Sequence, residues 1–312
     1  MVSLSNHESI WYTFIHIQKD TEGFLATKRV GIIGYPIRHS ASPAFQQAAL
    51  DFKGIDAKFE AWAVEPGTVV EWMAEQDRTD LLGFGVTVPH KQEIMKVLDY
   101  VDNDAKAIGA VNTVVVGKDK RLLGYNTDAY GFLHALQEDG EFTPAGQHVL
   151  VLGAGGVSRA VCTVLLREGV ASLTLANRTV ARAEALLGDL ATGGVQVEAI
   201  SLEPDSLKQA LATKNPMALI VNCTLLGMLH GSDEEASPIP GELIPSGSLV
   251  FDLVYNPAET PLMKLAEAAG AKTLGGLSML VYQGTKGFQL WTGEAAPLEI
   301  MMAAAKKAVW TK

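Results

Sequence analysis

The sequence predicts an α/β protein with two domains. Segments typical of strands and of helices alternate along most of the chain, which favours βαβ units around a parallel sheet. A glycine-rich turn, 153–156, directly follows an apolar run near the middle of the chain. The chain has 312 residues, of which 48% are hydrophobic, and this is enough for one or two buried cores.

The first half of the chain predicts one alternating unit. It opens with a short apolar run that ends in glycine, at 29–34, which is typical of a buried strand. A helix is expected to begin near Ser42, because Pro43 suits a first helical position. Further strands are expected at 59–64, 83–88 and 111–116, helices at 66–75 and 90–98, and a turn at 118–121.

The second half predicts another unit. A connecting helix is expected at 130–138, and a fully apolar strand at 148–152 leads into the glycine turn. The expected elements after the turn are helices at 158–168, 180–190 and 260–269 and strands at 172–176, 219–222 and 249–253. The tail from 279 to 312 is largely helical and brings no strand, so we expect it to pack on the first domain.

These elements set the predicted domain bounds. Residues 29–127 together with 277–312 form an N-terminal α/β domain, and residues 128–276 form the second domain. Residues 1–28 are an unassigned N-terminal extension with an aromatic patch between acidic residues. This extension fits an added strand, a partner-binding arm or a mistaken start.

Composition and charge exclude several classes of function. The formal net charge is −10 and no lysine- or arginine-rich run is present, which argues against a nucleic-acid partner. No apolar run approaches the ~20 residues of a transmembrane helix, and the start of the chain lacks the features of a signal peptide. We therefore expect a cytoplasmic protein without a membrane partner. Cys162 and Cys223 lie in apolar stretches and predict buried free thiols, with no disulfide or metal-ligand spacing.

The glycine turn predicts a dinucleotide site. Gly153 allows a tight turn, Gly155 lets the backbone approach a pyrophosphate, and the small Ser158 lets the following helix pack against the strand. The N-terminus of that helix offers free N–H groups and a partial positive charge to phosphates. Such turns also occur for packing alone, and it is the apolar strand directly before this one that favours a nucleotide.

The end of the next strand predicts which dinucleotide binds. NAD sites usually carry Asp or Glu there, which binds the ribose 2′-hydroxyl. This chain has Asn177-Arg178-Thr179, with Arg182 one turn further on. A guanidinium binds a 2′-phosphate that a carboxylate would repel, which favours NADP(H) and an NADP-binding Rossmann domain. The alternative is that both arginines are solvated residues at a helix start.

Four polar clusters in the first domain predict a second ligand site. Each closely follows an apolar or β-branched segment; they are 39–43, 86–91, 109–113 and 126–128. In an open α/β sheet, ligands bind beyond the carboxyl ends of the strands. We therefore expect these clusters to meet in one cleft.

From about Val30 to its tail, the chain resembles the shikimate dehydrogenase family. The resemblance rests on these clusters, the glycine turn, the Asn177-Arg178-Thr179 triplet and three further motifs at 222–228, 252–257 and 279–283. It implies an NADP-dependent oxidoreductase of chorismate and aromatic amino acid biosynthesis, a monomer or homodimer, that reversibly reduces 3-dehydroshikimate to shikimate. Members that act on quinate or related cyclic hydroxy acids leave a second substrate open.

The resemblance also implies roles for single residues. Lys91 matches the catalytic lysine, which protonates the developing alkoxide, and Asp128 would orient its ammonium. The implied substrate-binding residues are Ser40 and Ser42 for the carboxylate, Thr87, Asn112, Asp128 and Gln283 for the ring hydroxyls, and Tyr255 near the substrate and nicotinamide. The implied cofactor-binding residues are Gly153, Ala154, Gly155, Gly156, Val157, Asn177, Arg178, Thr179, Arg182, Thr224, Met228, Gly276 and Met279.

Some of these residues have a second interpretation, and the sequence departs from the family pattern at a few positions. Ser42 has a second interpretation as a helix cap, and a lone lysine at a helix start is usually a surface residue. The sequence departs from the family pattern at Gln46-Gln47, where His-Asn is usual, at Gly85, where Asn is usual, and at Leu225, where proline is common. A rival of another class is a non-catalytic protein that senses the metabolite. The retention of both Lys91 and Asp128 argues against a sensor.

Overall fold

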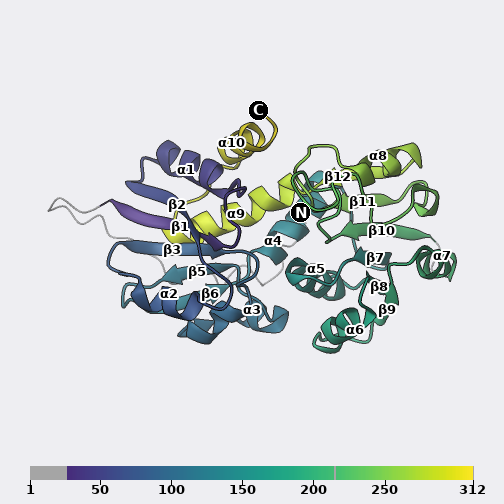
Figure 1. Ribbon diagram of the computed structural model, residues 1–312, viewed down its shortest axis with the longest axis horizontal. Coiled ribbons are helices and arrows are strands. Elements are labelled where there is room, and N and C mark those ends of the chain that lie inside the picture. The colour runs from purple at the N-terminus through teal and green to yellow at the C-terminus, as the bar shows by residue number, and fades with distance from the viewer. Residues whose placement is uncertain (1–26, 214–215, 312) are drawn as a thin grey trace, which may run out of the picture.

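The computed structural model describes residues 27–213 and 216–311. Each of its two lobes is built around a six-stranded sheet with helices on its faces, and helices α4 and α9 lie between the lobes (Figure 1). The predicted two-domain α/β fold is confirmed. Nearly all of the predicted extension 1–28 lies outside the described residues. No helix in the described part of the chain is long and apolar enough to cross a membrane.

The first sheet has the strand order β2-β1-β3-β5-β6-β4. Its strands are β1 (Lys28–Gly34), β2 (Ala57–Ala63), β3 (Leu81–Val86), β4 (Tyr100–Val101), β5 (Thr113–Val116) and β6 (Leu122–Tyr125). The expectation of a wholly parallel sheet is wrong here, because β5 runs antiparallel to both β3 and β6. Only a short turn joins β5 to β6, and a connection of that length permits a hairpin but no parallel crossover.

The helices of the first lobe differ from the predicted ones at one functional segment. Helices α1 (Ser42–Lys53) and α2 (Val69–Glu75) were predicted, whereas α3 (Asn103–Ile108) was not. The helix predicted at 90–98 is wrong: only a short 3-10 turn forms, η2 (Glu93–Val97). The Lys91 carbonyl is engaged elsewhere, because it accepts a hydrogen bond from the Val111 N–H at 2.8 Å. This bond places Lys91 beside the start of β5.

The second sheet is parallel throughout, with the order β12-β11-β10-β7-β8-β9. Its strands are β7 (His148–Leu152), β8 (Ser172–Asn177), β9 (Gln196–Ser201), β10 (Met217–Asn222), β11 (Leu249–Asp252) and β12 (Lys272–Gly275). Its helices are α5 (Gly156–Arg167), α6 (Val180–Gly188), α7 (Pro204–Thr213), η4 (Gly241–Leu243) and α8 (Pro261–Ala268). The central strands are apolar on both faces, as strands covered by helices on both sides must be.

The chain passes between the lobes at two helices. They are α4 (Asp128–His134), which continues as the π-helical turn η3 (Ala135–Asp139), and α9 (Leu277–Thr292). The helices cross closely at Gly131, where a Cβ atom would lie 2.7 Å from the Gln283 backbone nitrogen. The last helix, α10 (Leu298–Trp310), lies on α1 (Figure 1). Side chains of α9 and α10 fill the core under β1, which confirms that the tail packs on the first domain.

Candidate active site

Three of the four polar clusters, 86–91, 109–113 and 126–128, meet around one ion pair. The Lys91 Nζ donates to the Asp128 Oδ2 at 2.6 Å. Lys91 follows β3 and Asp128 opens α4, and their side chains are only 14% and 9% exposed. A pair this shielded from water keeps a stronger mutual attraction than a surface pair. Lys91 and Asp128 are therefore adjacent, which the expected role of Asp128 in orienting the ammonium requires.

Asn112 holds the other oxygen of the Asp128 carboxylate. Its Nδ2 donates to the Asp128 Oδ1 at 2.7 Å, and its Oδ1 accepts the Thr127 N–H at 2.7 Å. The Asn126 side chain accepts the Asp128 N–H at 3.0 Å. Both carboxylate oxygens thus have fixed donors, and the N-terminus of α4 favours the negative charge. The arrangement fixes where the Lys91 ammonium points.

Of the further predicted substrate residues, Gln283 is linked to this pair through Thr127, and Thr87 directly follows β3. The Thr127 Oγ1 donates to the Gln283 Oε1 at 3.4 Å, which brings α9 to the site. The Thr87 methyl lies over Gly34, where a Cβ atom would be 2.4 Å away, so only glycine fits there. Sequence reasoning missed Thr127, although it lies inside the predicted cluster 126–128; its hydroxyl connects Asn112 with Gln283.

The serine cluster lies in the loop before α1. The Ser42 N–H donates to the Ser40 Oγ at 3.3 Å. The proposed capping role of Ser42 is wrong: Ser42 is the first residue of the helix, and Ala41, at the cap position, makes no side-chain bond. Ser42 is buried and Ser40 half-buried.

The glycine turn has the backbone that a dinucleotide needs. Gly153 has a positive φ of 98°, and a Cβ there would lie 2.9 Å from Thr224. Apart from its chain neighbours, no described residue has an atom within 4 Å of a Cβ built at Gly155, so the space before the N-terminus of α5 is open to a pyrophosphate. Ser158 is buried and bridges the turn, since its Oγ donates to the Gly153 carbonyl and accepts the Gly155 N–H.

The glycine turn also approaches the lysine. A Cβ built at Gly156 would lie 3.9 Å from the Lys91 Cδ. Gly156 is the first residue of α5 in the second lobe, whereas Lys91 belongs to the first. The glycine turn of the second lobe therefore lies next to the lysine of the first.

The end of β8 carries the predicted 2′-phosphate residues. The Asn177 Oδ1 accepts the Ala154 N–H at 3.1 Å, which ties this strand to the glycine turn. Arg178 and Arg182 are exposed, and within 27–213 and 216–311 neither guanidinium makes a hydrogen bond or ion pair. Thr179 precedes α6 and its hydroxyl caps nothing. Two exposed guanidiniums beside a glycine turn fit a phosphorylated ribose.

The remaining predicted cofactor residues lie in the loop after β10, in α5 or at the start of α9. Thr224 is held by the Asn222 Oδ1, and Gly276 lies so close to Leu253 that a Cβ would be 2.1 Å from its carbonyl oxygen. Val157 is half-buried against the core of the second lobe, and Met279 belongs to that core, with 6% of its surface exposed. Met228 is half-buried. Burial raises the pKa of Tyr255.

Two of the four departures from the family pattern, Gln46 and Gln47, make hydrogen bonds that join different elements. The Gln46 Nε2 donates to the Gly284 carbonyl at 2.9 Å and ties α1 to α9. The Gln47 side chain accepts the Phe59 N–H at 2.8 Å at the edge strand β2. Gly85 leaves room for a side chain, since the nearest atom to its Cβ position is Ile32 Cγ1 at 3.4 Å. Leu225 is 67% exposed.

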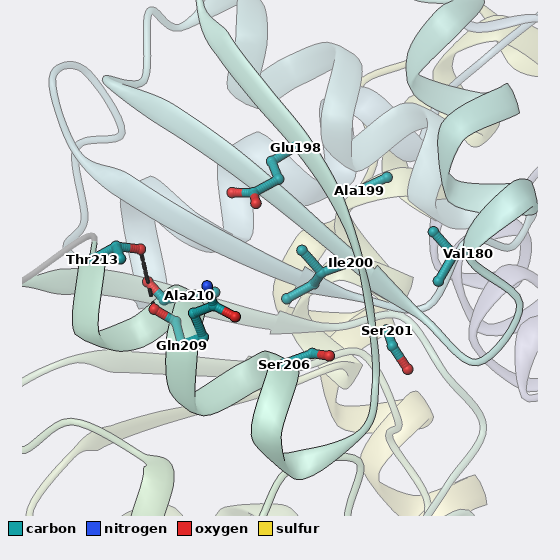
Figure 2. A pocket seen from close by; sticks show the side chains of 9 residues that line it. All are labelled: Val180, Glu198, Ala199, Ile200, Ser201, Ser206, Gln209, Ala210 and Thr213. Atoms are coloured by element: carbon teal, nitrogen blue, oxygen red, sulfur yellow. Dashed lines mark hydrogen bonds between the residues drawn. The ribbon is translucent and has the colours of Figure 1, made fainter.

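Two buried cysteines and a pocket in the second lobe lie apart from the Lys91–Asp128 pair. Cys162 and Cys223 are buried free thiols, as predicted, and burial raises the pKa of Cys223 to about 12. The described residues contain no cluster of three metal-ligating side chains. A pocket of about 300 Å³ lies between β9 and α7, and Figure 2 shows its lining. None of the predicted site residues lines it.

Comparisons with known proteins agree with this geometry. Three family models match: "Shikimate dehydrogenase substrate binding domain" at 32–114, "Shikimate / quinate 5-dehydrogenase" at 137–224 and "Shikimate 5'-dehydrogenase C-terminal domain" at 276–306. The shikimate dehydrogenase (NADP(+)) of Symbiobacterium thermophilum is 43% identical, with 90% of this chain and 94% of that protein covered. Its counterpart from Methanopyrus kandleri is 41% identical, with coverage of 89% and 94%.

A solved structure shows the same likeness in three dimensions. Shikimate 5-dehydrogenase from Thermus thermophilus, in complex with NADP(H) and shikimate, superposes with a TM-score of 0.78 at 38% sequence identity. The alignment covers 90% of this chain and 99% of the other.

Proposed function

The chain belongs to the shikimate dehydrogenase family, and on that basis we propose which residues perform its reaction. The protein is an NADP-dependent oxidoreductase that reversibly reduces 3-dehydroshikimate to shikimate. The observation that carries the residue assignment is the buried Lys91–Asp128 pair, which lies beside the glycine turn at Gly156.

Lys91 is the proton donor in this proposal. NADPH, when bound, supplies the hydride to the ring ketone. The carbonyl oxygen then gains negative charge, and the Lys91 ammonium gives it a proton. The Asp128 carboxylate holds the ammonium in place through the 2.6 Å bond. In the reverse direction the neutral amine takes the hydroxyl proton.

The other polar groups orient the ring. Ser40 and Ser42 bind the carboxylate with hydroxyl donors, and Thr87, Asn112 and Gln283 contact the ring hydroxyls. Asn112 positions Asp128 at the same time, because its Nδ2 already donates to that carboxylate. Tyr255 completes the site next to the nicotinamide.

Cofactor choice follows from the second lobe. Arg178 and Arg182 bind the 2′-phosphate, and the glycine turn binds the pyrophosphate. The distribution of strands supports a Rossmann domain at 128–276 and a substrate domain at 29–127 plus 277–312. The proposed location is the cytoplasm, and the proposed assembly is a monomer or homodimer.

A four-way kinetic comparison tests the function. Shikimate and quinate are each assayed with NADP and with NAD, and we expect the largest kcat/KM for shikimate with NADP. A larger value for quinate with NAD would refute both the substrate and the cofactor assignments. Quinate remains the second candidate because one matching family model covers both acids.

Replacing the lysine separates an enzyme from a sensor. Lys91→Ala should lower kcat roughly 10²- to 10⁴-fold, the usual contribution of a positioned acid or base, while NADP affinity stays unchanged. The exposed Lys96, in η2, provides the matched control Lys96→Ala, which should keep full activity. Unchanged turnover in Lys91→Ala would contradict the mechanism.

A further inference from the structure

A second buried polar pair lies at the ends of two neighbouring strands of the second sheet. Asn222 ends β10 and Asp252 ends β11, and the two residues are paired in register. The Asn222 Nδ2 donates to the Asp252 Oδ1 at 2.8 Å, and neither residue is exposed to solvent. The proton transfer described above uses neither side chain.

Asn222 fixes the start of the loop that follows β10. Its Oδ1 accepts the Thr224 N–H at 2.9 Å and the Thr224 hydroxyl at 2.8 Å. Because that oxygen faces a backbone N–H, the amide can have only one orientation, and Nδ2 must face Asp252. Thr224 and Met228 are the proposed cofactor contacts of this loop.

Asp252 fixes the start of the loop that follows β11. Its Oδ1 accepts the Val254 N–H at 3.0 Å, and its Oδ2 accepts the Thr260 hydroxyl at 2.6 Å. Thr260 in turn caps α8, since its Oγ1 accepts the Met263 N–H at 3.2 Å. This loop carries Tyr255, the proposed substrate contact.

The two loops also meet at their far ends. The Leu229 N–H donates to the Asn256 carbonyl at 2.8 Å. The loops are thus joined at the base by the Asn222–Asp252 bond and further out by a backbone bond. A shift of one loop must therefore move the other.

Packing alone does not account for a carboxyl group buried at position 252. Burial raises its pKa, while its three hydrogen bonds oppose that shift. No cation pairs with it among the residues that the structure describes. An unpaired buried carboxyl opposes folding, and an apolar residue would fill the same space more favourably. Its directional bonds to both loops are what an apolar residue cannot supply.

We propose that Asn222 and Asp252 are positioning residues that make the binding of NADP and of the hydroxy acid depend on each other. The pair fixes the loop after β10, which carries Thr224 and Met228, relative to the loop after β11, which carries Tyr255. A ligand that orders one of these loops therefore also orders the other. This proposal rests on the function proposed above, because it assigns the two loops to those two ligands.

The main test removes the carboxylate. Asp252→Ala leaves three donors without an acceptor, and we expect the Kd of NADP and the KM of shikimate each to rise roughly tenfold or more. The factor by which saturating shikimate tightens NADP binding should fall toward one. Asp252→Asn keeps an oxygen for Asn222 and Val254, and its amide can donate to the Thr260 hydroxyl, so it should stay within about threefold of the wild type.

Asp102→Ala is the control for stability alone. Asp102 caps α3 by accepting the Asp104 N–H at 2.9 Å, outside the hydrogen bonds that join the two loops. Its replacement should lower the unfolding free energy by about 1 kcal/mol, with both ligand constants unchanged. Unchanged ligand constants in Asp252→Ala would overturn the proposal, and so would equal changes in Asp102→Ala and Asp252→Ala.

Asn222→Asp covers the case in which Asp252→Ala does not fold. In this variant one carboxylate oxygen still accepts both hydrogen bonds from Thr224. The other oxygen replaces the Nδ2 donor and faces the Asp252 Oδ1, so only the hydrogen bond between the two loops is lost. Two adjacent carboxylates share a proton as the pH falls, and that proton restores the link. NADP affinity relative to the wild type should therefore recover at acidic pH; a ratio that does not change with pH would contradict the proposal. NADP binding is measured by titration without turnover, so a wrong substrate assignment would show in the wild-type kinetics instead.

Discussion

Asp128→Asn is the sharpest test of the ion pair, because both partners of this carboxylate are donors. The Lys91 ammonium donates to one oxygen and the Asn112 amide to the other. Asn112 cannot turn around, since its own oxygen accepts the Thr127 N–H. In Asp128→Asn the new NH2 group must therefore face a donor in either orientation, and one bond is lost.

The size of the effect follows from the bond that is lost. A hydrogen bond to a charged group contributes about 1.5–3 kcal/mol, which corresponds to a fall in kcat/KM of roughly 10- to 150-fold. Loss of the negative charge also frees the ammonium to move away from the reacting oxygen, so kcat should fall more than KM rises.

Steady-state kinetics with shikimate and NADP measure this change. Asp56→Asn, the same substitution at an exposed position in the loop before β2, is the control and should have no effect. A value of kcat/KM within threefold of the wild type in Asp128→Asn would refute the assignment of Asp128 as the group that positions Lys91.

Three further predictions concern the second lobe. Arg178→Ala should lower the preference for NADP over NAD at least about tenfold while Arg182 is kept, as measured by the ratio of the two kcat/KM values, because one charged bond to the 2′-phosphate is lost. Gly153→Ala should weaken NADP binding and lower the unfolding free energy by about 1–3 kcal/mol in denaturant titrations, because φ is 98° and the methyl would contact Thr224. Burial raises the pKa of Asp252 above its ordinary 3.8, so the folded chain binds this proton more tightly than the unfolded one. Its contribution to the unfolding free energy should therefore grow as pH falls through the folded-state pKa, and Asp252→Asn should lack that pH-dependent part.

The sequence predicts most of the second lobe because its central strands are apolar runs. The strand at 148–152 matches β7 at both ends, and the glycine turn lies where the pattern places it. By contrast, β9 and α7 were not predicted, since β9 is an edge strand with exposed or half-buried residues at every position and lacks an apolar run. Edge elements carry little of the hydrophobic pattern on which such predictions depend.

The candidate site, too, was predicted only in part. Polar clusters after strands predict that Lys91, Asn112 and Asp128 come together, because the topology of α/β sheets gathers such positions at one edge. The helix predicted at 90–98 failed because a tertiary bond from Val111 to the Lys91 carbonyl competes with the local helical bonds. The roles of Gln46 and Gln47 depend on contacts with α9 and β2 that no local pattern contains.

The packing of α9 and α10 against α1 and β1 has a consequence for synthesis on the ribosome. Strands β1 to β3 emerge early, but the side chains that cover them, such as Phe288 and Met301, emerge last. The whole second sheet, from β7 to β12, is made without interruption between these two events. The second lobe can therefore complete its core first. Until α9 and α10 have been made, one apolar face of the first sheet stays uncovered and can bind chaperones or aggregate.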